Sequence, residues 1–236
     1  MLPCLRSRDP DVREEMDDPA CDPATLERTY ARFDLVNAIV SAPRAVYREW
    51  VRPRLRAGGT VRLLDVGTGG ADLPRRLLRW AAADGDLRVV AIDPDPRSIA
   101  YARSLPPVPG LELRQATTRD LAREGERFDV VLSNHVLHHL SGVELGAILA
   151  DSEALLRRAG VAVHGDIARS ALAYAAFAAA TAPFEPTLLR GTFIRADGLA
   201  SIRRSHTARE LAAAAPPGWC VRRGIPYRLE LVRRVP

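Results

Sequence analysis

The sequence predicts an α/β protein built on a doubly wound, mostly parallel sheet. Short apolar runs that end at residues 65, 92 and 132 alternate with amphipathic segments, as strands joined by crossover helices do. A glycine-rich turn follows the first run directly. In open α/β sheets, ligands bind at such junctions, against the carboxyl ends of the strands. The 236 residues are enough for one domain with a full core.

The N-terminal part is expected to form a tail and a helical lid. Residues 1–22 are rich in Pro, Asp and Arg and have no apolar period, so we predict a disordered tail. Residues 23–57 carry apolar side chains at helical spacing, and Pro43 divides them into separate helices. These lid helices precede the sheet and are placed to cover a ligand site. We assign residues 23–236 to a single domain.

The alternation that follows predicts the strands and their connecting helices. The strands are expected at residues 61–65, 87–92, 111–115, 128–132 and 161–164, with one or two more within 220–233. The helices are expected at residues 73–83, 97–103, 145–158 and 207–214, the last with Thr207 as its N-cap. Residues 168–206 interrupt the alternation, and we interpret them as a cap inserted after the fifth strand.

Composition argues against several classes of partner. The formal net charge is +5 and every basic residue is Arg, but the Arg pairs are scattered rather than gathered on one element, so we expect no nucleic-acid partner. No run approaches the roughly 18 apolar residues of a membrane span, and the first residues lack a signal-peptide core. We therefore expect no membrane association and a cytoplasmic location. The scattered cysteines form neither a disulfide framework nor a metal knuckle.

The glycine turn can be read in two registers. A dinucleotide site of the form G-x-G-x-x-G would require glycine at position 72, where Asp72 stands. The alternative, acidic-x-G-x-G-x-G, fits residues 65–71 except that Ala71 replaces the last glycine. Together with Asp93 after the second strand and the segment FDVVLSNHVLHHL from residue 128, this pattern resembles class I S-adenosylmethionine-dependent methyltransferases. The resemblance is to the small-molecule branch that acts on natural products and quinones.

The resemblance implies a seven-stranded Rossmann-like methyltransferase sheet and S-adenosylmethionine as cofactor. Asp65 would accept from the ammonium of the cofactor, and the glycine turn would bring backbone N–H groups to its carboxylate. Asp93 would take both ribose hydroxyls, since two acceptor oxygens match two adjacent donors; a plain turn residue is the alternative. The expected cofactor contacts are Asp65, Gly67, Thr68, Gly69, Asp93, Pro94, Thr117, Thr118, Ser133 and Asn134. Thr117 and Thr118 fall where the family contacts adenine, and an ordinary loop role is open for both.

The residues after the fourth and fifth strands are candidates for the methyl-acceptor side. The Asn/Asp-Pro-Pro-aromatic signature of base N-methyltransferases is absent there. His135 is the best-placed general base. Asp166 is a second base or an acceptor for a substrate hydroxyl, with an ion pair to Arg169 as the alternative. His138 and His139 are expected to serve packing or capping, and we predict no metal because no carboxylate is near them in the sequence.

These observations lead to a small-molecule methyltransferase, with O-methylation of a phenolic or polyketide-like hydroxyl in secondary metabolism as the favoured reaction. C-methylation of a quinone-like or other activated carbon is the alternative reaction. A non-catalytic binding protein on the same fold is the alternative of another class. Tyr174 and Phe177 of the cap are interpreted as pocket or core residues, and Arg203 and His206 as weaker pocket candidates. We expect a monomer or a homodimer.

Overall fold

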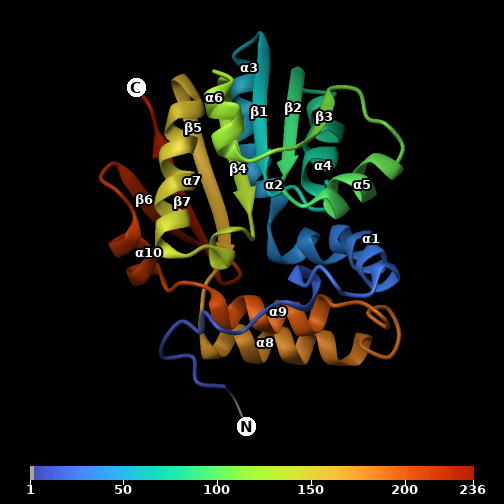
Figure 1. The fold of residues 1–236 in the computed structure, drawn as a ribbon. Helices are drawn as coiled ribbons and strands as arrows, with labels where there is room; N and C mark the ends of the chain where they lie inside the picture. The colour runs from blue at the N-terminus through green and yellow to red at the C-terminus, as the bar shows by residue number, and fades with distance from the viewer. Residues whose placement is uncertain (1–2) are drawn as a thin grey trace.

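The computed structural model describes residues 3–236, apart from the side chains of residues 38 and 39. These residues form a seven-stranded sheet in the order β3-β2-β1-β4-β5-β7-β6 (Figure 1). The strands are β1 Thr60–Val66, β2 Asp86–Asp93, β3 Leu111–Gln115, β4 Phe128–Asn134, β5 Leu156–Ile167, β6 Trp219–Gly224 and β7 Arg228–Arg234. Strands β1 to β5 pair in parallel, whereas β7 is antiparallel to both β5 and β6. The predicted doubly wound, mostly parallel sheet is confirmed.

The connecting helices cover both faces of the sheet. They are α4 Asp72–Ala81, α5 Pro96–Ser104, α6 Thr118–Arg123, α7 Gly142–Leu155 and α10 Ala208–Ala214. The predicted helices at residues 73–83, 97–103 and 207–214 match α4, α5 and α10 closely, and Thr207 is the N-cap of α10 as expected. The expected helix at 145–158 ends earlier, because β5 already begins at Leu156 and pairs with Phe128. Helix α6 was not predicted.

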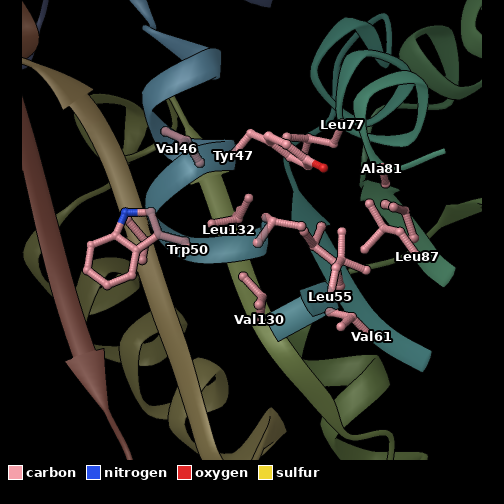
Figure 2. Close-up of a cluster of buried hydrophobic side chains, with 14 of the residues drawn as sticks. Val46, Tyr47, Trp50, Leu55, Val61, Leu77, Ala81, Leu87, Val130 and Leu132 are labelled. Atoms are coloured by element: carbon pink, nitrogen blue, oxygen red, sulfur yellow. The ribbon is translucent and has the colours of Figure 1, made fainter. Parts of the chain in front are cut away.

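A hydrophobic core lies on each face of the sheet, and the short helices before β1 cover one of these two cores. They are α2 Pro43–Val46, η2 Tyr47–Val51 and α3 Arg52–Arg56. Figure 2 shows Val46, Trp50 and Leu55 from these helices beside Val130 of β4, with Leu77 of α4 completing the cluster. A second cluster on the opposite face joins α7 and α10 to β4, β5 and β7. Each face of the sheet is therefore apolar and covered, as a parallel sheet requires.

The lid and the cap meet beyond the carboxyl ends of the strands. Helix α1 spans Pro23–Val40 and ends before Pro43, as predicted. The inserted segment forms α8 Ala171–Thr181, η4 Ala182–Phe184 and α9 Ile194–Arg204. In Figure 1, α1, α8 and α9 lie below the ends of the parallel strands. Within residues 3–236, no helix combines the length and the apolar character needed to cross a membrane.

The N-terminal segment corrects one expectation. Residues 3–22, which include η1 Glu15–Asp17, run along α9 instead of forming a loose tail (Figure 1). Asp9 pairs with Arg203 of α9 at 2.6 Å, and Glu14 is buried at 5% exposure. Specific polar contacts hold the segment, and such contacts leave no apolar period in a sequence. The expectation for residues 1 and 2 lies outside the described residues.

Candidate active site

A cavity of about 580 Å³ opens at the carboxyl ends of β1, β2 and β4. Its walls come from the glycine turn, the ends of β2 and β4, the lid helix α1 and the cap helix α9. The volume lies within the range of small-molecule sites in proteins. One part of the cavity contains the expected cofactor residues, and we call it the cofactor half. The other part contains the histidines that follow β4, and we call it the acceptor half.

Asp65, the buried carboxylate near the end of β1, lies in the cofactor half. Its side chain is only 2% exposed, and no Arg or His among residues 3–236 forms an ion pair with it. Burial, together with the nearby charges of Asp72 and Asp93, raises the pKa of Asp65 to about 7. A buried carboxylate at the wall of a cavity without a cation is poised for a cationic ligand group.

The glycine turn places backbone next to the same cavity. Gly67 has a φ of +69°, and a Cβ atom there would lie 2.5 Å from Cγ2 of Val136, so only glycine fits. The N–H of Gly69 donates to Oδ2 of Asp93 at 2.9 Å, and the N–H of Asp95 donates to Oδ1 at 2.9 Å. Asp93 is thereby fixed at the end of β2, the position at which the resemblance implies a contact with the ribose. Burial raises the pKa of the Asp93 carboxyl, although both backbone donors oppose that rise.

Seven of the ten expected cofactor contacts line the cavity. They are Asp65, Gly67, Thr68, Gly69, Asp93, Pro94 and Asn134. The structure corrects the other three. Thr117 is exposed and caps α6 through Asp120, while the hydroxyl of Thr118 donates to Asp151 at 3.1 Å. Ser133 is buried, and its hydroxyl lies 2.7 Å from Nδ1 of His164 on the neighbouring strand β5.

The lid contributes residues that the sequence did not identify. Tyr30 of α1 lines the cavity, and its hydroxyl lies 2.7 Å from Oγ of Ser98 at the start of α5. Asn37 donates to Asp72 at 3.2 Å, which connects α1 to the first turn of α4. Both contacts join segments distant in sequence, so periodicity in the lid could show helices but not which side chains reach the cavity.

His135 lies where the cofactor half meets the acceptor half. It follows β4 with a φ of +58°, and its N–H donates to the carbonyl of Gly165 at 2.9 Å. The ring lines the cavity, with Nε2 3.0 Å from Oγ of Ser41 and Nδ1 3.8 Å from Oδ1 of Asp166. This arrangement assigns the proton to Nδ1, facing the carboxylate, and leaves the lone pair of Nε2 on the side of Ser41. Such a nitrogen is suited to accept a proton.

Asp166 supports the site from behind and does not line the cavity. The side chain is 4% exposed and accepts from the N–H of His138 at 2.8 Å, from its Nδ1 at 2.8 Å and from the N–H of Ile167 at 2.7 Å. Burial alone would raise the pKa of Asp166, but the histidines hold it well below its usual range. The expectation that Asp166 contacts the substrate is therefore wrong, because its carboxylate binds His138 instead. The alternative ion pair with Arg169 is also wrong, since that guanidinium binds Glu210.

His138 is the centre of a buried polar chain rather than a packing residue. Its ring is 1% exposed, with Nδ1 bonded to Asp166 and Nε2 3.1 Å from Oε1 of Glu14. Burial would lower the pKa of His138, but the two carboxylates raise it to about 10. His139 is more exposed, and its Nδ1 lies 3.1 Å from Asp17. Carboxylates do surround these histidines, so the reason given for expecting no metal was wrong, although the expectation itself stays a prediction.

The cap closes the acceptor half with both apolar and polar side chains. Phe177 of α8 and Ile194 of α9 line the cavity, as does Val40 of α1. Tyr174, Arg203 and His206 are not among the lining residues. The acceptor space is therefore mixed: these apolar side chains share it with the polar residues Asp197, Ser201 and Arg204 and with the histidines after β4.

Comparison with known proteins agrees with the fold and the glycine turn. Residues 64–164, which run from the end of β1 into β5, match the family model described as a methyltransferase domain. This protein contains a class I S-adenosylmethionine-dependent methyltransferase domain. The matched region of this methyltransferase domain holds the glycine turn, Asp93 and His135, and S-adenosylmethionine is the cofactor of the family.

Both curated proteins and solved structures are similar to this chain. Over 106 residues the chain is 39% identical to the ubiquinone biosynthesis O-methyltransferase of Azorhizobium caulinodans, which covers 44% of this chain and 36% of the relative. The chain spans less than half the length of the curated relatives it matches. Among solved structures, the plantazolicin methyltransferase BpumL, in complex with SAH, is 12% identical with a TM-score of 0.56, covering 90% of this chain and 96% of that one. Human N-acetylserotonin methyltransferase, in complex with SAM, is 10% identical with a TM-score of 0.62, covering 91% and 56%. At these identities the structures share the fold alone.

Proposed function

We propose that this protein is an S-adenosylmethionine-dependent methyltransferase that O-methylates a phenolic or polyketide-like hydroxyl of a small molecule in secondary metabolism. The observation that carries the proposal is the position of His135, whose ring lines the cavity with Nε2 3.0 Å from Oγ of Ser41 and with Asp166 on the side of Nδ1. A base at this position can remove the proton that a hydroxyl loses as it becomes an ether. The ubiquinone O-methyltransferase relatives support oxygen as the acceptor atom.

The cofactor would be held by the residues that surround Asp65. Asp65 would accept from its ammonium, the turn with Thr68 and Gly69 would contact its carboxylate, and Asp93 would accept from the ribose hydroxyls. When bound, S-adenosylmethionine supplies an activated methyl group. The chain itself has to orient the acceptor and exclude water. Phe177 and Ile194 fit that task because they cover the acceptor half.

His135 would take the proton of the acceptor at Nε2. Ser41 accepts from Asn134 at 2.7 Å and lies 3.0 Å from that nitrogen, so its own hydroxyl can donate to Nε2, and an acceptor hydroxyl would have to replace this donor. Asp166 would stabilise the imidazolium through Nδ1. With His135→Gln, we expect kcat to fall about 100-fold, because general bases contribute about that much or more. The affinity for cofactor should change little, since its binding residues are elsewhere.

The test is a methylation screen with deuterium-labelled S-adenosylmethionine. Hydroxybenzenes, hydroxynaphthalenes and hydroxyquinones are incubated with the protein, and the products are analysed by mass spectrometry and NMR. A methyl ether supports the proposal, and a new carbon–methyl bond establishes the alternative C-methyltransferase. Cofactor binding without turnover of any hydroxyl compound would favour a non-catalytic binding protein. The cytoplasmic location and the monomeric or dimeric state stay predictions.

A further inference from the structure

A glycine in the middle of α9 faces the ring of Phe177. Helix α9 runs from Ile194 to Arg204, so Gly198 lies in its interior. Glycine is among the poorest helix formers, and an interior glycine in a short helix is expected to have a local reason. A Cβ atom at this position would lie 2.3 Å from Cζ and 2.5 Å from Cε1 of Phe177, far inside an ordinary carbon–carbon contact. The ring therefore occupies the place that a side chain at position 198 would take.

Phe177 belongs to the outer of the two cap helices. In Figure 1, α9 lies between α8 and the ends of the parallel strands. Phe177 of α8 and Gly198 of α9 nevertheless both line the cavity. The ring reaches the cavity because α9 has no side chain in its way at position 198. A side chain of the outer helix thereby becomes part of the acceptor wall.

Polar contacts fix α8 against α9 next to this ring. Arg195 of α9 donates to the carbonyl of Ala178 at 2.6 Å and to the hydroxyl of Thr181 at 2.7 Å. Ala173 and Thr181, which lie one turn before and after Phe177, are both buried. Helix α8 is therefore held in place, and a methyl group on the facing glycine would move the ring instead. Since an ordinary contact is about 3.5 Å, the edge of the ring would move by about 1 Å.

The polar side chains beside Gly198 already have partners. Asp197 accepts from two backbone N–H groups of the N-terminal segment, at 2.7 and 3.2 Å. The hydroxyl of Ser201 lies 2.8 Å from the carboxylate of Glu14. These contacts hold the N-terminal segment against α9. The ring of Phe177 is therefore the surface that this part of the wall offers to an apolar acceptor.

We propose that Gly198 determines which acceptors fit: because it lets Phe177 lie back against α9, an acceptor with two fused aromatic rings can place its second ring on Phe177. This inference rests on the proposed function, which supplies the phenolic hydroxyl that is methylated. Aromatic side chains bind flat aromatic partners by offset stacking or edge-to-face contact. With alanine at position 198, the ring would move off α9 into the space of the second ring, whereas an acceptor with one ring would keep its place.

The binding of two diols tests the proposal without any turnover. Catechol and 2,3-dihydroxynaphthalene carry the same pair of adjacent hydroxyls, and only the second has a further ring. Calorimetry on the full chain saturated with S-adenosylhomocysteine measures both dissociation constants. We expect the wild type to bind the naphthalene diol about tenfold more tightly than catechol, because the second ring buries more apolar surface.

Gly198→Ala should remove most of this preference and leave the affinity for catechol within about threefold of the wild-type value. Gly146→Ala is the matched control. Gly146 is also an interior helix glycine, in α7, but nothing lies within 4 Å of its Cβ position and it does not line the cavity. The control should therefore bind both diols as the wild type does.

A double variant shows whether Gly198 acts through the ring. Phe177→Leu should weaken binding of the naphthalene diol about fivefold through the lost aromatic contact. Leucine is shorter than phenylalanine and leaves room for a methyl group, so adding Gly198→Ala to it should change binding little. In chemical denaturation, Gly198→Ala should raise the midpoint in the Phe177→Leu background but not in the wild type, since alanine is the better helix former once the clash is gone.

Equal losses of affinity for both diols in Gly198→Ala would overturn the proposal, and so would the same loss in the Phe177→Leu background. A wild type that binds neither diol, or that has no preference for the naphthalene diol, would overturn it as well. If Gly198→Ala does not fold, Phe177→Trp fills the same space from α8 and should lower the preference in its place. If the naphthalene diol binds but is not methylated, the proposed O-methylation of phenols fails, while the binding data still decide the role of Gly198.

Discussion

Replacing Asp65 by Asn tests whether this carboxylate binds the ammonium of the cofactor. The side chain is buried and has no cationic partner among residues 3–236, so the variant should fold as well as the wild type or better. What it should lose is a charge-assisted hydrogen bond in a water-poor site. Such a bond is worth about 2 kcal/mol, which corresponds to about a 30-fold weaker binding of S-adenosylhomocysteine at pH 8.

The pH dependence sharpens this prediction. With a pKa of about 7, Asp65 is ionised at pH 8 but about nine-tenths protonated at pH 6 in the free protein. The ammonium favours the carboxylate, so binding below pH 7 must expel that proton, and wild-type affinity should fall about tenfold from pH 8 to pH 6. The Asp65→Asn variant has no such proton to lose. The ratio of the wild-type affinity to the variant affinity should therefore fall from about 30-fold at pH 8 to about threefold at pH 6.

Isothermal titration calorimetry with S-adenosylhomocysteine measures both effects. The amino group of the ligand titrates with either protein, so the ratio of the two affinities isolates Asp65. Running wild type at pH 6 in buffers of different ionisation enthalpy should also reveal the release of close to one proton. A ratio that stays constant between pH 6 and pH 8, or equal affinities at pH 8, would refute the reasoning.

Three further outcomes are expected. Asp93→Ala should weaken S-adenosylhomocysteine binding about 100-fold in calorimetry, because two charge-assisted bonds of about 1.5 kcal/mol each are lost, and unchanged affinity would show that the ribose binds elsewhere. Gly67→Ala should cost about 2 kcal/mol in chemical denaturation, since its Cβ meets Val136 at 2.5 Å, whereas Gly125→Ala, also at positive φ but in open space, should cost less. The pKa of His138 is raised from 6.5 to about 10, so its contribution is full below pH 6.5 and is lost as the pH rises through 10. From pH 6.5 to 10, the free energy of unfolding of the wild type should therefore fall by on the order of 3 kcal/mol more than that of His138→Gln. Chemical denaturation at each pH measures this, and the same pH dependence in both proteins would contradict it.

The cofactor half was largely predictable because its signals are local. A buried strand, a tight turn and a strand-terminal carboxylate each follow from a few consecutive residues. Asp65, Gly67 and Asp93 do line one cavity, and their contact with the cofactor stays a prediction. Thr117 was misplaced for an equally local reason, since a threonine before a short helix serves as its cap, and we did not predict α6.

The acceptor half was less predictable because its contacts join remote segments. His135 was identified from its place after a strand. Its relation to Asp166 depends on the pairing of β4 with β5, and its relation to Ser41 depends on where α1 ends. Glu14 gave no signal, because a polar, aperiodic segment looks the same in a sequence whether it is free or docked.

By itself, the sequence determined the succession of strands and helices along the chain, the glycine turn and the class of cofactor. Apolar period, turn residues and motif spacing are properties of neighbouring residues, and they carry over directly into local structure. Only the tertiary structure decided which carboxylates face which histidines. Burial and the proximity of charges set the protonation of Asp65, His138 and Asp166, and those quantities exist only once distant segments have come together.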